Sequence, residues 1–283
     1  MEDLWMQRTI LSLAGAIALI GFTAGQVAFA ADAPVAVRTT APSSDWTLTV
    51  GAEGRWMPAF DGASRMVVRP FPVFSFRRVG TPERFLSPRD GIGIGLIEFG
   101  GWHLGPVGQL RLPRRVSDDP VGLAGLDNVD VAVELGVFAE YWWTRWLRTR
   151  GEVRQGIGGH NGIVADFAAD AVVPVSSQIT LSGGPRVTLA SANALSPYFG
   201  ITPAQALASG LPAYNVGGGV RSVGAGAQVR YKWTPQLATY LFVEYDRLLN
   251  DAASSPLVTL RGSADQTQVG VGMTYSFDVR GLW

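Results

Sequence analysis

The sequence predicts an all-β fold: a transmembrane antiparallel up-and-down β-barrel of about 12 strands, with about 10 as the alternative. The chain is rich in glycine (35 residues) and contains 9 tryptophans, whereas charged residues make up only 16%. Apolar side chains recur at every second position through much of residues 45–283, which is the periodicity of a strand. Mean hydropathy is positive at +0.17. After residue 30, however, no uninterrupted apolar run reaches the roughly 20 residues of a spanning helix, which excludes a helical membrane protein there.

Residues 1–30 are predicted to be a cleaved signal peptide. The apolar stretch at 10–22 is shorter than a spanning helix, and residues 28–30, Ala-Phe-Ala, have the small residues that cleavage requires. We therefore expect the mature chain to start at Ala31, with an uncleaved anchor as the alternative. Acidic residues precede Met6 where a signal carries basic ones, so we hypothesise that translation starts at Met6. N-terminal sequencing of a cleavage-blocked precursor that begins further upstream would contradict this hypothesis.

Residues 31–44 are small, polar and proline-containing, and are expected to form a periplasmic lead-in to the barrel domain, residues 45–283. The second strand of that barrel, at 65–78, carries Pro70 and Pro72 on one parity. Because proline has no N–H for a β-ladder, this strand should be irregular or locally unpaired.

The segment at 83–111 alternates least regularly. A short strand is expected at 84–87, another at 92–96 and a third at 102–112. The count falls from about 12 strands to about 10 if this segment is miscounted. The other strands are expected at residues 46–56, 129–141, 148–154, 163–173, 179–190, 220–231, 237–245 and 269–277.

The hairpin at 129–154 shows the pattern most clearly, because apolar residues fill one face of each strand and charged residues occupy the other. A three-residue turn at 143–145 would set Glu140 opposite Arg148 and, further along, Glu134 opposite Arg154. The uncharged valine-rich face could then contact lipid. The same reasoning sets Arg186 opposite Asp170 in the next hairpin.

These inward charges are predicted to form a ladder inside the barrel. Acidic and basic positions alternate from strand to strand, so mutual neutralisation in a narrow lumen is favoured over an ion-selectivity filter. A barrel filled by its own ion pairs should conduct poorly. The lumen ladder comprises Glu134, Glu140, Arg148, Arg150, Glu152, Arg154, Asp166, Asp170 and Arg186.

Loop lengths predict the topology. Short turns follow Tyr141, Val175 and Tyr231 and should lie on the periplasmic side, whereas the long loops at 113–127, 191–218 and 248–266 should lie outside. A helical turn is expected at 203–208. A soluble lipocalin-like barrel is the alternative architecture. An interfacial girdle is expected at the periplasmic strand ends, formed by Tyr141, Trp143, Tyr231, Trp233, Tyr275 and Phe277.

No catalytic, cofactor or metal site is expected, and neither is an enzyme activity. The chain has no cysteine, and its two histidines, His103 and His160, are remote in sequence. Lys+Arg and Asp+Glu both number 23, which gives no basic excess for nucleic acid.

Two further sequence patterns resemble ligand-binding motifs but are better explained by structural roles. The acidic group at 117–119 with Asp127 could hold Ca²⁺, but its spacing is irregular, so a solvated loop is favoured. Gly91, Gly93 and Gly95 superficially suggest a nucleotide-binding loop. Because no helix follows, these glycines are interpreted as permitting close packing within the barrel.

Several short patterns, in order and spacing, resemble the MipA/OmpV family of MltA-interacting outer-membrane proteins. They lie at residues 121–126, Glu134, 156–162, 198–202, 209–211, 255–256, 261–263 and 275–277. The resemblance implies an outer-membrane barrel and, for the best-known member, a scaffold that brings a lytic transglycosylase together with a bifunctional murein synthase. It transfers no catalytic residue. The chain departs from the family by continuing past Phe277 to Trp283, which keeps the same parity and could serve as the terminal assembly aromatic.

Three functions follow as hypotheses. The first is a non-catalytic scaffold for murein enzymes, the second a small-solute channel, and the third an adhesion or ligand-binding module that acts through the outer loops. In each case the expected surroundings are outer-membrane lipid and lipopolysaccharide.

Overall fold

The computed structural model describes residues 45–81 and 83–280. The expected signal peptide, the lead-in and Trp283 lie outside the described residues. Among the helices of the described part, none is long and apolar enough to cross a membrane.

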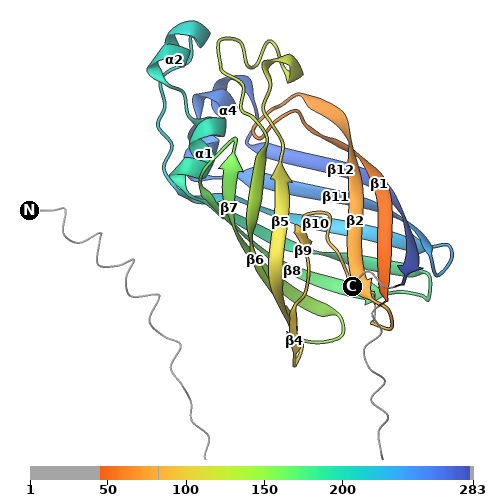
Figure 1. Ribbon diagram of the computed structural model, residues 1–283. Coiled ribbons are helices and arrows are strands. Elements are labelled where there is room, and N and C mark those ends of the chain that lie inside the picture. Colours follow the sequence, from red (N-terminus) through yellow and green to blue (C-terminus); the bar gives the residue numbers. More distant parts are fainter. Residues whose placement is uncertain (1–44, 82, 281–283) are drawn as a thin grey trace, which may run out of the picture. The chain divides into compact units, whose positions relative to one another are not determined.

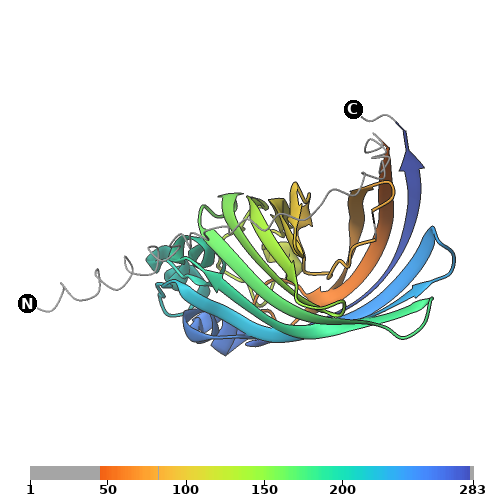
Figure 2. The same cartoon turned by 90° about the horizontal axis from the view of Figure 1, so that it is seen from below.

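Twelve strands form one antiparallel sheet that curls into a nearly closed barrel (Figures 1 and 2). The predicted fold class is confirmed. The strands are β1 (Trp46–Pro58), β2 (Met66–Arg78), β3 (Ile92–Gly93), β4 (Ile97–Phe99), β5 (Trp102–Arg111), β6 (Ala132–Trp142), β7 (Leu147–Gly158), β8 (Ile163–Pro174), β9 (Ile179–Ala190), β10 (Gly219–Lys232), β11 (Leu237–Leu248) and β12 (Asp265–Val279).

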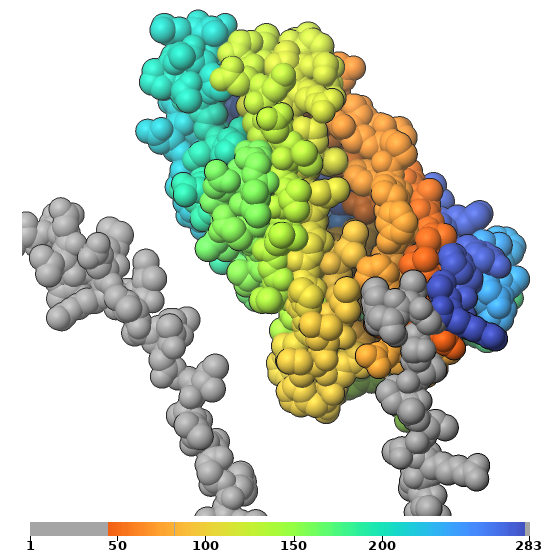
Figure 3. Space-filling model, viewed as in Figure 1, coloured from red at the N-terminus to blue at the C-terminus, as the bar shows by residue number. Residues whose placement is uncertain are grey.

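The first and last strands are joined within the sheet, because β1 pairs with β12 from Trp46 opposite Val279 to Trp56 opposite Val269. The sheet instead ends at β2 and β3, which are not paired with each other. On this side the surface is hollowed between the orange β2 and the yellow β5 (Figure 3).

Proline explains why β2 is an edge strand. Pro70 lies opposite Gly54 and Pro72 opposite Ala52 in an unbroken ladder between β2 and β1. Residues of one parity direct their nitrogens to one edge of a strand, so this regular ladder leaves both proline nitrogens on the other, free edge. The prediction that this strand is locally unpaired is confirmed at the free edge of β2. The predicted irregularity is not found at the other edge, where β2 pairs regularly with β1.

The outer face of the barrel is apolar. On β6 the exposed positions are Val133, Leu135 and Val137, whereas Glu134 and Glu140 of the same strand are buried inside. Since lipid-facing and lumen-facing residues alternate in a transmembrane barrel, this arrangement suits a bilayer outside and a polar interior.

The turn between β6 and β7 is fixed by a threonine. The N–H of Trp143 donates to the carbonyl of Leu147 at 3.0 Å, so residues 144–146 form the turn. Thr144 Oγ1 accepts hydrogen bonds from the N–H groups of Trp146 at 3.2 Å and Leu147 at 3.0 Å. A short hydroxyl side chain that satisfies two turn donors selects the first position of the loop.

The expected turn at 143–145 was therefore wrong by one residue, and the register by two. Glu140 lies opposite Arg150 rather than Arg148. The other predicted pairs are displaced in the same way, since Glu134 lies opposite Gly156 and Arg186 opposite Ala168. An even shift preserves parity, so every charged residue remains on the predicted face.

The long loops fold into helices over the end of the barrel opposite the short turns (Figure 1). They contain η1 (Val116–Asp118), α1 (Ala192–Phe199), α2 (Pro203–Ser209), α3 (Asn250–Ser254) and α4 (Pro256–Arg261). Helix α2 confirms the expected helical turn, while the other helices were not expected. Leu123, Ile201 and Leu257 are fully or almost fully buried in one of two apolar clusters among these loops.

Candidate functional site

The chain between β2 and β3 enters the barrel instead of forming a strand. The strand expected at 84–87 is wrong, because these residues have no ladder partner in the described part of the chain. We call residues 83–91 the inward segment. It starts at the end of the barrel that carries the short turns and runs through the lumen toward the end with the long loops. It ends where the Gly91 N–H donates to Glu152 of β7 at 3.2 Å.

Asp90 anchors the inward segment to β7. Its Oδ2 accepts a hydrogen bond from Arg148 Nη2 at 2.6 Å, and its Oδ1 lies 3.8 Å from Arg150 Nε. Arg148 is completely buried and also contacts Glu140 at 2.8 Å and Asp170 at 3.2 Å. A buried guanidinium is tolerated only where carboxylates compensate its desolvation, so Asp90 belongs to the charge balance of the lumen.

The other side of the inward segment is held by different strands. Arg89 Nη1 donates to Asp246 of β11 at 2.5 Å, and its Nη2 donates to Thr188 of β9 at 2.7 Å. Arg55 of β1 donates to the carbonyl of Pro88 at 3.0 Å. The inward segment thus crosses the lumen from β7 to β11 and β1.

The structure brings the whole predicted ladder into one ion-pair network. The side chains are buried, except for Asp166, which is partly exposed. Diagonal neighbours replace the directly opposed pairs. The contacts join Arg148 to Glu140 and Asp170, Arg150 to Glu152 (2.7 Å) and Glu140 (3.3 Å), Arg154 to Glu134 (2.9 Å), Glu152 and Asp166, and Arg186 to Asp170 (2.6 Å).

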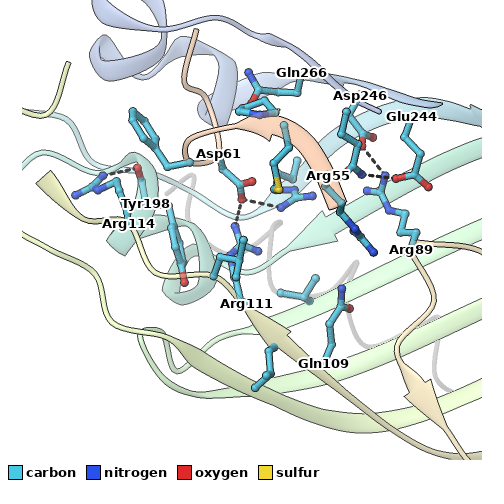
Figure 4. A pocket seen from close by; sticks show the side chains of 18 of the residues that line it. Arg55, Asp61, Arg89, Gln109, Arg111, Arg114, Tyr198, Glu244, Asp246 and Gln266 are labelled. Carbon is cyan, nitrogen blue, oxygen red and sulfur yellow. Dashed lines mark hydrogen bonds and ion pairs between the residues drawn. The ribbon is translucent and has the colours of Figure 1, made fainter. Parts of the chain in front are cut away.

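A loop-side cavity of about 230 Å³ lies above the inward segment and is lined by its Pro88 and Arg89. Figure 4 shows this cavity with Arg89 against Asp246 on one side and Asp61 against Arg111 on the other. Arg111 Nη2 donates to Asp61 Oδ2 at 2.5 Å. Asp61 lies in the loop after β1. Burial alone would raise its pKa, but Arg111 and then Arg221 outweigh burial and hold the pKa below the ordinary 3.8.

A turn-side cavity of about 420 Å³ lies on the opposite side of the inward segment. Phe85 and Leu86 of the segment form part of its wall, together with Trp142 of β6 and Arg230 of β10. The inward segment therefore separates two cavities that occupy opposite ends of the lumen.

The predicted girdle residues gather at the end with the short turns, where the structure places them in neighbouring pairs. Ring centroids are 4.8 Å apart for Tyr141 and Trp143, 4.6 Å for Tyr231 and Trp233, and 6.3 Å for Tyr275 and Phe277. The indole N–H of Trp143 donates to Thr149, and that of Trp233 donates to Thr239, both at 3.0 Å. Their place at a membrane interface stays a prediction.

The two histidines do not form a joint site. His160 Nδ1 accepts from the Gly162 N–H at 3.3 Å, so its Nε2–H faces Glu134 at 2.9 Å. His103 lies at the turn end, with its Nδ1 3.7 Å from Glu98. Among residues 45–81 and 83–280, no group of histidine and carboxylate side chains is arranged to hold a metal ion.

The acidic loop residues are engaged in separate contacts. Asp118 pairs with Arg69 at 2.9 Å. Asp119 is buried and accepts from the Gly122 N–H at 3.1 Å, so the favoured solvated loop is wrong at this residue. The close packing expected at the glycines is confirmed, since a Cβ on Gly91 would meet Val107.

Sequence reasoning missed several lumen residues. Besides Arg89 and Asp90, these are Glu53, Arg55, Tyr240, Glu244 and Asp246, which are inward on β1 and β11. Glu53 with Arg55, and Glu244 with Asp246, are spaced two residues apart, so the alternation used for β6 and β7 could have identified them. Arg89 and Asp90 carry no such signal because they are not in a strand.

A model of the family described as MltA-interacting protein MipA matches residues 50–277. Among solved structures, the chain is similar to the NanC porin, with 9% identity over 82% of this chain and 100% of that chain and a TM-score of 0.40. An outer-membrane channel from Pseudomonas putida F1 is 9% identical. The match covers 87% of this chain and 100% of that chain, with a TM-score of 0.43. The KdgM porin is 10% identical. The match covers 81% of this chain and 99% of that chain, with a TM-score of 0.39. No curated protein matches the chain.

Proposed function

The chain belongs to the MipA family, and we propose that this outer-membrane barrel protein is a non-catalytic scaffold that brings a periplasmic lytic transglycosylase and a murein synthase together. Its apolar outer face would contact outer-membrane lipid and lipopolysaccharide. The family description, which names an MltA-interacting protein, supports a partner of the first kind.

The observation that carries the proposal is the inward segment, which is tied across the lumen. The inward segment is tied to β7 through Asp90 and to β11 through Arg89. Breaking such buried, charge-assisted contacts costs about 1.5 to 3 kcal/mol for each hydrogen bond. A barrel with this segment in place offers solutes no wide passage, so its function is expected to lie on its surfaces.

The turn end offers a surface for periplasmic partners. Trp146 is exposed in the turn at 144–146, and Trp143 and Trp233 are exposed beside this turn and the turn at 234–236. Exposed tryptophans on rigid turns are favourable anchors for a protein interface. The hydroxyl groups of Thr144 and Thr234 fix both turns, which limits the entropy lost on binding.

Affinity capture with purified partners tests the scaffold. The barrel in detergent is immobilised, and binding of a purified lytic transglycosylase and of a murein synthase is measured separately and then together. Replacing Trp146 and Trp233 by alanine should weaken capture at least tenfold. Leu207→Ala, at an exposed position of α2 on the opposite end, is the matched control. Unchanged capture by the tryptophan variant would place the scaffold surface elsewhere, and absence of capture by the natural chain would refute the proposal.

A small-solute channel is the second candidate, favoured by the cavities on both sides of the inward segment. In this case the segment would act as a gate. Single-channel recording in a planar bilayer separates the two candidates, because steps of open-pore size in the natural chain would support the channel and defeat the closed lumen.

A further inference from the structure

The turn-side cavity is cationic. It is lined by Arg84, Arg145, Arg230 and Lys232, whereas its acidic residues are Glu83 and Glu98. Glu98 pairs with Arg84, and Glu83 bridges Arg230 and Lys232. In the described part of the chain, Arg145 makes no ion pair, so the cavity retains positive charge that no internal carboxylate neutralises.

Polar atoms in this cavity lack partners within the described protein. Arg230 Nε and Gln228 Oε1 are buried, and neither has a hydrogen bond. Both residues line the cavity. Buried polar groups are normally satisfied, so two unsatisfied atoms beside a cavity of about 420 Å³ indicate space for a polar ligand.

Glu83 shows how a carboxylate is held here. Its Oε1 lies 2.6 Å from Arg230 Nη2, and its Oε2 lies 2.5 Å from Lys232 Nζ. This two-point contact is the geometry by which basic side chains bind carboxylate or phosphate. Glu83 is also the first residue of the inward segment, so Arg230 and Lys232 bind a carboxylate of the inward segment itself.

Aromatic side chains form another part of the wall. Trp142 and Phe85 both line the cavity. Trp142 is oriented by a hydrogen bond from its Nε1 to Glu140 at 2.9 Å, and the ring of Phe85 is covered by the Arg148 guanidinium at 5.1 Å. Rigid rings of this kind provide apolar contact at low entropic cost.

We infer that the turn-side cavity binds small organic anions, whose carboxylate or phosphate group competes with Glu83 for Arg230 and Lys232 while the apolar part packs on Trp142 and Phe85. The inference is independent of the scaffold function. Binding would detach the first residue of the inward segment, and the anchors at Arg89 and Asp90 would remain.

Calorimetric titration of the folded barrel in neutral detergent with phenyl phosphate tests the site, and inorganic phosphate serves as the second probe. Glu83→Gln should tighten binding several-fold, because it removes the competing carboxylate and keeps the side-chain shape. Arg230→Gln should weaken binding at least tenfold. Arg247→Gln is the matched control, since Arg247 is exposed and pairs with Asp265 at the other end of the barrel.

The opposite signs make the outcome decisive. Tighter binding in Glu83→Gln together with weaker binding in Arg230→Gln supports the site. Equal losses in Arg230→Gln and Arg247→Gln would show attraction to net charge only and overturn it, as would unchanged or weaker binding in Glu83→Gln. If phenyl phosphate binds no more tightly than inorganic phosphate, the aromatic part of the inference is wrong.

Discussion

Arg148 Nη2 donates a hydrogen bond to Asp90 Oδ2 at 2.6 Å, although the two residues are 58 positions apart in the sequence. This contact joins a non-strand segment to the most deeply buried arginine of the barrel wall. The position of the inward segment therefore depends on the same charge network that fills the lumen.

Asp90→Asn should loosen the inward segment. The substitution removes a charge from the Arg148 and Arg150 contacts, at a cost of about 1.5 to 3 kcal/mol for a hydrogen bond to a charged group. Single-channel recording should show openings that the natural chain lacks. Asp118→Asn removes the same charge from a loop contact with Arg69 and should leave the current unchanged. A closed Asp90→Asn barrel would mean that the segment does not depend on this anchor.

Thr144→Ala should destabilise the β6–β7 hairpin, because two backbone N–H groups lose their acceptor. These donors are exposed to water, so the loss should be about 0.5 to 1.5 kcal/mol. Urea unfolding in lipid vesicles measures it. Thr144→Ser keeps the hydroxyl group and should retain most of the stability. If serine and alanine are equally destabilising, the methyl group rather than the hydrogen bonds fixes the turn.

Asp61→Asn should destabilise the protein at neutral pH, and the effect should fade in acid. Arg111 and Arg221 outweigh burial and keep the pKa of folded Asp61 below 3.8. A lowered folded pKa contributes stability that is complete above the unfolded value and is lost as pH falls through the folded one. Unfolding free energies of both proteins should therefore differ most above the ordinary pKa of 3.8 and converge only as pH falls through the lower folded pKa. A difference that persists in acid would show that the amide disrupts packing instead.

Gly136→Ala should be strongly disruptive, because a Cβ at this position would collide with the Val153 carbonyl of the neighbouring strand. Overpacking of this kind costs about 1 to 3 kcal/mol. The matched control is Gly54→Ala on β1, where a Cβ meets nothing within 4 Å. Equal unfolding free energies for the two variants would contradict the tight approach of β6 and β7.

The sequence was sufficient to predict which face of the barrel each strand residue occupies. It was not sufficient to predict which residues of neighbouring strands lie opposite each other. Period-2 alternation assigns Glu134 and Arg154 to the inner face, whichever residues they oppose. Register depends on which residue begins the turn, and here that choice is made by hydrogen bonds to Thr144. Long arginine side chains then reach diagonal carboxylates, so Arg154 still contacts Glu134 at 2.9 Å despite the shifted ladder.

The inward segment was beyond prediction from local patterns. Its four-residue alternation at 84–87 imitates a short strand, and the partners that hold it come from β1, β7, β9 and β11. Contacts of this kind depend on the closed tertiary structure and leave no periodic trace. The Pro88-Arg89-Asp90-Gly91 sequence was the available signal, since adjacent charges between proline and glycine suit neither face of a membrane strand.

Because Trp46 lies directly opposite Val279, the ends of the barrel strands are already neighbours. A short linker between them, with a new break in the connection after β2, would give a circular permutant whose strands follow one another in the order of the sheet, apart from β4, which shares an edge of β5 with β3. Its inward segment would then become an N-terminal arm, and the two open edges of the sheet, one at β3 and one at β2 with its Pro70 and Pro72, would coincide with the new chain ends. The natural chain thus has the strand order of a simple meander that has been circularly permuted. It starts at β1, two strands away from the open edge between β2 and β3.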